Sequence, residues 1–323
     1  MNSDLIKLSN DYKQNIYLDF TDEDNLEEIT NDIYLVYSQF VDSTELNETK
    51  DKSIIRNLLL EKLVVIPPNY NETDIDKLTE QIKELKKIKQ PEQRTPEWHT
   101  FRNNRLTASD LGTALKQSKY SSREKLIAKK CGYHEPFITG AAIKHGVKYE
   151  DVAVNIYAGR NNVVVHEYGC LPHPNLSYFG ASPDGICDYT SQNKNYIGRM
   201  LEIKCPKSRP ITGIIPEHYE LQVQGQLEVC ELQYCDYLEC SIKEYPGFIE
   251  FIDDSNETIT KTKSNMEKGV IIELYNTKTK SDKYIYINTF NSQEDIEKWE
   301  EETIHTIFQN DHIEYIGTTY WYL

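Results

Sequence analysis

ASPDGICDYTSQNKNYIGRMLEIKCP, residues 181–206, is the stretch of sequence that decides the fold. Its end has the alternation of a half-buried strand, in which successive side chains point to opposite faces. The apolar face holds Leu201, Ile203 and Cys205. The other face holds Glu202 and Lys204, and the turn before the strand presents Asp184. Because burying an unpaired charge is costly, an acid and a base together on this face predict a functional site.

The composition is that of a globular protein. With 323 residues, 38% of them hydrophobic, the chain can bury the core of one large domain, or of one domain and a smaller one. No run of eighteen apolar residues occurs and the chain begins with a polar stretch, so we expect neither a membrane span nor a signal peptide. The seven cysteines form no CxxC pair, which favours packed thiols in a reducing, intracellular compartment.

The charge is unevenly distributed along the chain. The net charge of −16 argues at first against a nucleic-acid partner. However, residues 1–90 hold 11 basic and 19 acidic side chains, whereas residues 101–148 hold 10 basic and 3 acidic ones. A local positive groove is therefore compatible with an acidic chain. An ordinary solvated surface is the alternative explanation of these lysines and arginines.

The sequence predicts two regions, a helical N-terminal extension over residues 1–90 and a larger domain over residues 91–323. Within the extension, Thr73 stands three residues before Asp76, a capping-box pattern for a helix that ends at Pro91. The extension carries no catalytic signal, so we interpret it as a packing scaffold or a partner surface.

The larger domain has the pattern of a mixed α/β fold. Helices are predicted from about Pro96 and over residues 140–159, the second closed by Gly159. Between them, Thr107 or Ser109 is expected to cap a further helix. A β meander, another helix, two more strands and a last helix follow, which favours one mixed central sheet flanked by helices.

Glu150 is an unusual residue for its place in the predicted second helix. The apolar stripe of that helix is expected to hold Ile143, Val147, Val154 and Tyr157. Glu150 lies on this stripe, where a carboxylate is costly unless it is paired or bound to a cation. A structural salt bridge is the simpler explanation when Glu150 is considered alone.

Glu150, Asp184 and Glu202 together predict a metal site beside Lys204. Three converging carboxylates would repel one another without a counter-charge, and oxygen ligands select Mg²⁺ or Mn²⁺ over zinc. Two ions would fit, with Asp184 between them. Lys204 would contact the attacking water, which suits in-line attack on a phosphodiester.

Five segments resemble one known family in their order along residues 95–243. They are EWHTFRNNRLTASD, KHGVKYEDVA, GASPDGICD, LEIKCP and ELQVQGQLEV. This array is similar to the lambda-phage-type exonuclease, or YqaJ-type viral recombinase, family of the PD-(D/E)XK nuclease superfamily. The resemblance implies a restriction-endonuclease-like α/β core, a mixed central sheet flanked by helices, with the N-terminal helical extension added.

The resemblance also implies a role for each matching residue. Asp184 and Glu202 would hold the metals with the Ile203 carbonyl, and Glu150 would complete the second metal site. Lys204 and Gln222 would position the water. The pocket for a terminal 5′-phosphate would consist of Arg102, Ser109 and Ser182. Alternatives remain for three neighbours: Ser109 as a helix cap, Trp98 as a core anchor, and Gln226 as a solvated or packing residue.

The implied activity is that of a Mg²⁺-dependent 5′→3′ exonuclease acting on duplex DNA ends. Its product would be a 3′ single-stranded tail for recombination, repair or viral genome processing. Partners implied are DNA ends, a single-strand annealing protein and further copies of the chain, without a membrane. The many Asn, Ile, Lys and Tyr residues suggest the AT-rich genome of a large DNA virus, and hence the host cytoplasm or a viral factory. A structure-specific endonuclease, a combined DNA and RNA nuclease, and a non-catalytic DNA-end scaffold are the alternatives.

Overall fold

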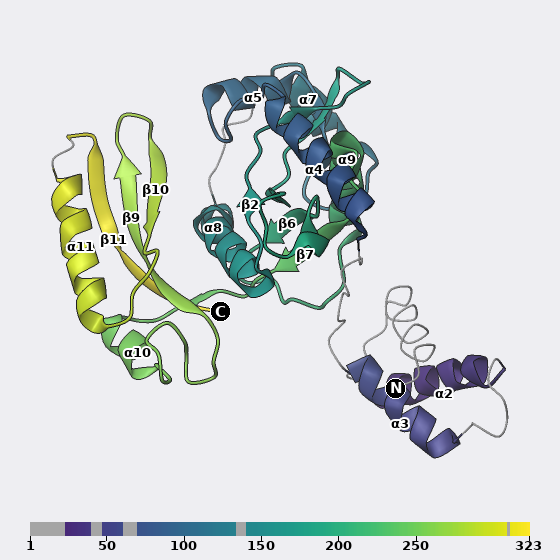
Figure 1. Cartoon of the computed structure of the whole chain (residues 1–323). Helices are drawn as coiled ribbons and strands as arrows, with labels where there is room; N and C mark the ends of the chain where they lie inside the picture. Colours follow the sequence, from purple (N-terminus) through teal and green to yellow (C-terminus); the bar gives the residue numbers. More distant parts are fainter. Residues whose placement is uncertain (1–22, 40–46, 61–69, 134–139, 309–310) are drawn as a thin grey trace. The chain divides into compact units, whose positions relative to one another are not determined.

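The structure is a computed structural model that describes residues 23–39, 47–60, 70–133, 140–308 and 311–323 (Figure 1). The chain divides into two compact units, Met1–Pro68 and Asn69–Leu323. In the first unit, α2 (Glu23–Ser38) packs against α3 (Glu48–Leu60). The buried side chains between them include Ile29, Ile33, Tyr37 and Ile55. The helices predicted for the N-terminal region are present.

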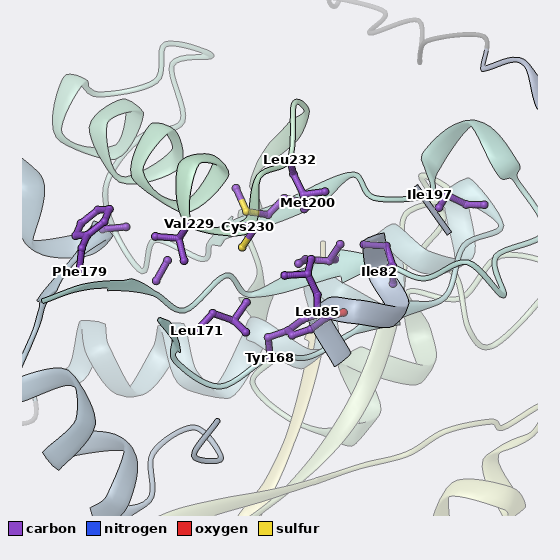
Figure 2. Close-up of a cluster of buried hydrophobic side chains, with 13 residues drawn as sticks. Ile82, Leu85, Tyr168, Leu171, Phe179, Ile197, Met200, Val229, Cys230 and Leu232 are labelled. Carbon is purple, nitrogen blue, oxygen red and sulfur yellow. The ribbon is translucent and has the colours of Figure 1, made fainter. Parts of the chain in front are cut away.

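Helix α4 (Glu72–Lys87) belongs to the second unit, so the boundary lies at Pro68 and not at residue 90. Its Ile82 and Leu85 are buried in the main hydrophobic cluster, where Figure 2 shows them near Tyr168 and Met200. Because this apolar face of α4 is buried only by packing against the larger unit, the boundary between the two units lies before α4. The helix is capped by Asn71, which accepts from the Asp74 amide, and not by the predicted Thr73.

A mixed four-stranded sheet forms the centre of the larger unit, in the order β2-β5-β6-β7. The strands are β2 (Val165–His166), β5 (Gly185–Cys187), β6 (Met200–Lys204) and β7 (Cys235–Glu239). Strand β6 pairs antiparallel with β5 and parallel with β7, with Glu202 opposite Tyr237. A second sheet has the order β1-β4-β3, from β1 (Leu106–Thr107), β3 (Leu171–Pro172) and β4 (Phe179–Ala181).

Helices and short turns flank these two sheets. They are α5 (Pro96–Asn103), η1 (Ala108–Asp110), α6 (Leu111–Ala114), α7 (Arg123–Lys130), α8 (Ala141–Asn161), η2 (Lys194–Tyr196) and α9 (Glu217–Cys230). Helix α8 packs against β6, and α9 packs against β4 and η1 (Figure 1). This arrangement confirms the predicted PD-(D/E)XK-like core with an N-terminal helical extension.

The prediction of which residues of α8 are buried is partly wrong. Ile143 is exposed, whereas Tyr149, Val152 and Tyr157 are buried. The helix also continues through Gly159 to Asn161 and is capped by Asn162, which takes the left-handed conformation with φ 55°. An asparagine tolerates this conformation well, so the glycine is not needed as the cap.

The C-terminal part adds a sheet in the order β10-β9-β11-β8. It comprises β8 (Lys243–Glu244), α10 (Phe248–Asp253), β9 (Lys268–Asn276), β10 (Ser281–Tyr286), α11 (Gln293–Ile307) and β11 (Ile313–Tyr322). The predicted hairpin is therefore present as β9 and β10. No described helix is long and apolar enough to cross a membrane. Six of the seven cysteines are buried or half-buried thiols, and Cys131 is exposed.

Candidate active site

One cavity of about 260 Å³ brings the predicted site residues together. Its lining includes every one of them: Arg102, Ser109, Glu150, Ser182, Asp184, Glu202, Ile203, Lys204 and Gln222. These residues come from α5, η1, α8, the turn between β4 and β5, β6 and α9. Segments up to 120 positions apart in the chain thus converge around β6, an interior strand of the central sheet.

Glu202 is the most enclosed carboxylate of the cavity, with none of its surface exposed. The Gln222 and Gln226 side-chain amides each donate to it, one to each carboxylate oxygen, at 2.7 Å. The Lys204 ammonium pairs with the same carboxylate. Burial of an ionised group is tolerated when its oxygens are satisfied in this way, so α9 and β6 together hold Glu202 in place.

Gln226 differs from the prediction that it is solvated or merely packing. It is buried, and besides bonding Glu202 it donates to the Ser182 carbonyl at 3.2 Å. Its spacing of four residues from Gln222 places both amides on one face of α9. That spacing was the signal in the sequence that could have identified it.

Asp184 and Glu150 are the two carboxylates of the cavity whose ionised forms are disfavoured in the folded protein. Asp184 accepts from the Ile203 amide at 2.7 Å. Burial, reinforced by the nearby Glu202 and Glu150 carboxylates, raises the pKa of Asp184 well above its ordinary value. Burial also raises the pKa of Glu150, although Arg94 pairs with it at 2.9 Å and opposes the shift.

The charge of Lys204 is reinforced by its surroundings. Burial opposes its charged form, but the Glu202 and Asp184 carboxylates outweigh burial and raise its pKa. Its ammonium also lies 4.8 Å from the centre of the Tyr219 ring. Lys204 is therefore a cation and hydrogen-bond donor in this site, and not a base.

The donor set fits a hard divalent cation. Two of the three carboxylates have raised pKa values, chiefly because they are buried, and the nearby Arg94 and Lys204 do not reverse these shifts. A divalent ion is the counter-charge that oxygen ligands prefer. Within the described ranges, no group of three or more His, Cys, Asp or Glu side chains is already arranged as a metal site. The carboxylates would thus have to turn toward an ion.

Arg102 forms the polar end of the cavity. Its guanidinium donates to the Ser182 hydroxyl at 3.0 Å and to the Ser109 hydroxyl at 2.9 Å. It also lies 4.3 Å from the Trp98 ring centre. Burial lowers the pKa of Arg102, and the fork of donors beside two hydroxyls suits a phosphate.

Two alternatives considered for this end are settled by the structure. Thr107 caps η1 and closes a capping box with Asp110, so Ser109 is not the cap. The Ser109 hydroxyl instead accepts a hydrogen bond from Arg102. Helix α5 has no buried residue, and Trp98 is half-buried against Arg102, so Trp98 is not a core anchor.

Arg94 is a site residue that the sequence did not identify. It lines the cavity and pairs with Glu150, although it lies 56 positions earlier in the chain. Its φ of 64° is unusual for a residue other than glycine and costs free energy, as often occurs at functional sites. A single arginine before a helix cap gives no pattern from which to expect this contact.

The basic stretch of residues 101–148 is divided between the interior and the surface. Lys130 donates to the Arg102 and Arg105 carbonyls, and Lys148 is buried against Glu273. The exposed basic side chains of this stretch include Lys116, Lys119, Arg123, Lys125 and Lys129. Part of this basic stretch is therefore exposed, whereas Lys130 and Lys148 are engaged in contacts within the protein.

A larger cavity of about 620 Å³ lies away from these carboxylates, between α8 and strands β9 and β11. Glu267 pairs there with Arg160 at 2.5 Å and with Lys261 at 3.1 Å. Lys268 instead donates to the Asp254 carbonyl and the Ser255 hydroxyl, and burial lowers its pKa to about 8. Glu267 is the one carboxylate among the described residues that line it, so this cavity lacks the three carboxylates of the smaller one.

Residues 97–233 match the model of the YqaJ-like viral recombinase domain. The chain carries a domain of this family. All nine predicted site residues lie inside the YqaJ-like domain, whereas Arg94 precedes it. The family resemblance seen in the sequence is thereby confirmed.

The chain is also similar to a viral protein and to a bacterial one. Uncharacterized protein R354 of Acanthamoeba polyphaga mimivirus is 36% identical over 266 residues, or 75% of this chain and 48% of the relative. The chain thus spans about half the length of that relative. Two crystal structures of LHK-Exo, an alkaline exonuclease from Laribacter hongkongensis, are 30% and 29% identical, and one contains dAMP. Each covers 45% of this chain and 73% of the other, with TM-scores of 0.38 and 0.37.

Proposed function

We propose that the chain is a metal-dependent deoxyribonuclease that degrades one strand of duplex DNA from its 5′ end. The observation that carries this proposal is the continuity of one cavity from the Arg102 fork to the Glu202–Lys204 pair. Ser182 joins the two ends, since its hydroxyl accepts from Arg102 and its carbonyl accepts from Gln226. A terminal phosphate held by Arg102 would place the next phosphodiester beside Glu202, which favours removal of nucleotides from an end.

Each side chain has a distinct role in the proposed reaction. Asp184, Glu202 and the Ile203 carbonyl would hold Mg²⁺ or Mn²⁺, and Glu150 would complete a second position once Arg94 moves away. A bound ion would supply positive charge that lowers the pKa of water and stabilises charge on the phosphate. Lys204 donates a hydrogen bond to the attacking water, and Gln222 fixes the carboxylate that faces it.

Digestion of linear duplexes labelled at either the 5′ or the 3′ end, with Mg²⁺ or with a chelator, tests the function. We expect Mg²⁺-dependent release of nucleotides from the 5′ end and a growing 3′ tail. Cutting of a closed circular duplex would show an endonuclease instead. Binding to ends without cleavage would show a scaffold, and equal cleavage of RNA would show a broader nuclease.

The viral relative bears on the biological process in which the proposed nuclease would act. The relative named above is a mimivirus protein, which supports recombination or genome processing during infection of a host cell. A single-strand annealing protein that binds the 3′ tail would be a second partner. A pull-down with the full chain and a tailed duplex tests for it.

Arg102→Ala should remove the preference for 5′-phosphorylated ends while metal-dependent cleavage persists. Charge-assisted hydrogen bonds are the strongest polar contacts in such a pocket, so the rate ratio between 5′-phosphate and 5′-hydroxyl duplexes should fall by about tenfold or more. Arg102→Lys should recover only part of it, because an ammonium cannot reproduce the fork. Arg123→Ala, outside the cavity on α7, is the control and should keep the parental ratio. An unchanged ratio in Arg102→Ala would remove Arg102 from end recognition.

A further inference from the structure

Helix α9 connects the successive parts of the active site. Tyr219, Gln222 and Gln226 follow one face of the helix at spacings of three and four residues. Gln226 contacts Ser182 and Glu202, Gln222 contacts Glu202, and the Tyr219 ring lies under Lys204. Seven residues of helix span about 10 Å. Tyr219 therefore marks the end of the site that lies farthest from the phosphate pocket.

Aromatic rings continue from this end toward the surface. The Tyr219 ring centre lies 4.1 Å from that of His218, and the His218 ring centre lies 5.4 Å from that of Tyr120. Tyr219 and His218 are half-buried, while 64% of Tyr120 is exposed. We call Tyr120, His218 and Tyr219 the aromatic platform.

The loop that presents Tyr120 is fixed before any ligand arrives. The Gln117 and Ser118 amides both donate to the Gly112 carbonyl, at 2.7 and 3.0 Å, and the Ser118 hydroxyl accepts from the Tyr120 amide. A Cβ on Gly112 would lie 2.6 Å from the His218 Cβ, so α6 and α9 are as close as a glycine permits. Such preorganisation lowers the entropic cost of binding.

Cations accompany these rings. The Lys119 ammonium lies 5.5 Å from the Tyr120 ring centre, and Lys204 lies beside Tyr219. Partial burial and the charges of Lys119, Lys204 and Arg209 together lower the pKa of His218, which shows that all three cations are near. Rings that stack on bases beside cations that attract phosphates are the features of a surface for unpaired nucleic-acid strands.

We propose that the aromatic platform stacks unpaired bases of the cleaved DNA strand, on the 3′ side of the scissile phosphate. The proposal rests on the proposed function, because the strand direction follows from a 5′-phosphate at Arg102 and cleavage beside Lys204. The nucleotides that follow the scissile phosphate then pass Tyr219 and reach Tyr120. Only unpaired bases expose the faces that such rings bind, so the duplex would open before its strand reaches Lys204.

Binding to a 5′-phosphorylated duplex with a four-nucleotide 5′ tail, measured by fluorescence anisotropy in chelator, tests the platform without cleavage. Tyr120→Ala should weaken binding roughly tenfold, as expected for the loss of one base–aromatic stack. Tyr120→Phe keeps the ring and should bind like the parent. Tyr178→Ala is the matched control, because Tyr178 is also 64% exposed but lies before β4, outside the platform.

A second probe lacks the base at the third position of the tail, the one that reaches Tyr120 in the proposed path. It should bind the parent roughly tenfold more weakly than the intact tail does, yet bind Tyr120→Ala with no further loss, because both changes remove the same stack. Equal affinity of Tyr120→Ala and the parent, or a full abasic penalty in Tyr120→Ala, would overturn the proposal.

The outcome for the proposed function is separate. A parent that shows the abasic penalty but never degrades the duplex in Mg²⁺ would keep the platform and lose the nuclease. A parent that degrades duplexes without an abasic penalty would keep the nuclease and lose the platform. A parent that shows neither the abasic penalty nor degradation in Mg²⁺ would lose both.

Discussion

Asp184→Asn should abolish cleavage and, in metal-free protein, raise the melting temperature. The rate should fall at least about a hundredfold, because the substitution removes a charged ligand from the proposed metal site. The side-chain oxygen of the asparagine can still accept the hydrogen bond that the Ile203 backbone amide donates to Asp184. The fold should therefore survive, and DNA binding in chelator should be retained.

The gain in stability follows from the pKa of Asp184. Because the folded state raises this pKa, the folded state binds the proton more tightly than the unfolded chain does. Its contribution to stability is present at low pH and is lost as the pH rises through the folded-state pKa. At pH values above the folded-state pKa the ionised carboxylate thus destabilises the fold, and Asn removes that penalty. The difference in melting temperature between variant and parent should shrink as the pH falls toward about 4, the ordinary aspartate pKa.

Asp188→Asn is the matched control, with the opposite sign. Asp188 is also buried, but the Lys86 ammonium and the Thr190 amide and hydroxyl outweigh that burial and lower its pKa. Its ionised form therefore stabilises the fold at neutral pH, so Asp188→Asn should lower the melting temperature and leave cleavage active. A fully active Asp184→Asn enzyme would refute the assignment of Asp184. An unchanged or lowered melting temperature of Asp184→Asn would refute the inference that the ionised Asp184 carboxylate destabilises the fold.

Lys204→Met should also reduce cleavage by at least about a hundredfold, but it should lower the melting temperature. Methionine keeps much of the side-chain volume and removes the ammonium that would orient the water. It also leaves the buried Glu202 carboxylate with amide donors alone, and an ion pair broken on one side is destabilising. Single-turnover cleavage and thermal unfolding in chelator measure the two effects.

Lys298→Met provides the comparison for Lys204→Met. Lys298 lies on α11 in an exposed pair with Glu302 at 3.9 Å, and such pairs contribute little to stability. Both its cleavage rate and its melting temperature should match the parent. If Lys204→Met cleaved DNA at the parental rate, the water would have to be positioned by another group.

The sequence predicted which residues share one cavity more accurately than it predicted the helices around that cavity. The alternation of β6 placed Glu202 and Lys204 on one face, because a strand has only two faces. Glu150 was placed in the cavity, although the buried residues expected around it included the exposed Ile143. A helix has many possible faces, and only its packing partners select which one is buried.

The residues that the sequence did not identify act through contacts between distant segments. Gln226 resembles any polar residue on a helix until Glu202 and Ser182 are placed beside it. The role of Arg94, in the turn before α5, depends on its contact with Glu150 on α8. The position of α4 depends on the sheet that buries Ile82 and Leu85, so the boundary at residue 90 came from the proline and not from packing. Local pattern carries no information about such pairings.

The docking of α4 has a consequence for the order in which the chain folds. Gln81 on α4 donates to the Cys230 and Glu231 carbonyls, 149 and 150 positions later. Contacts so distant in sequence close large loops, and their entropic cost slows folding. During synthesis α4 emerges early, with its apolar side uncovered until α9 has been made. The nuclease core would then be completed late, in a step that joins its earliest helix to one of its later ones.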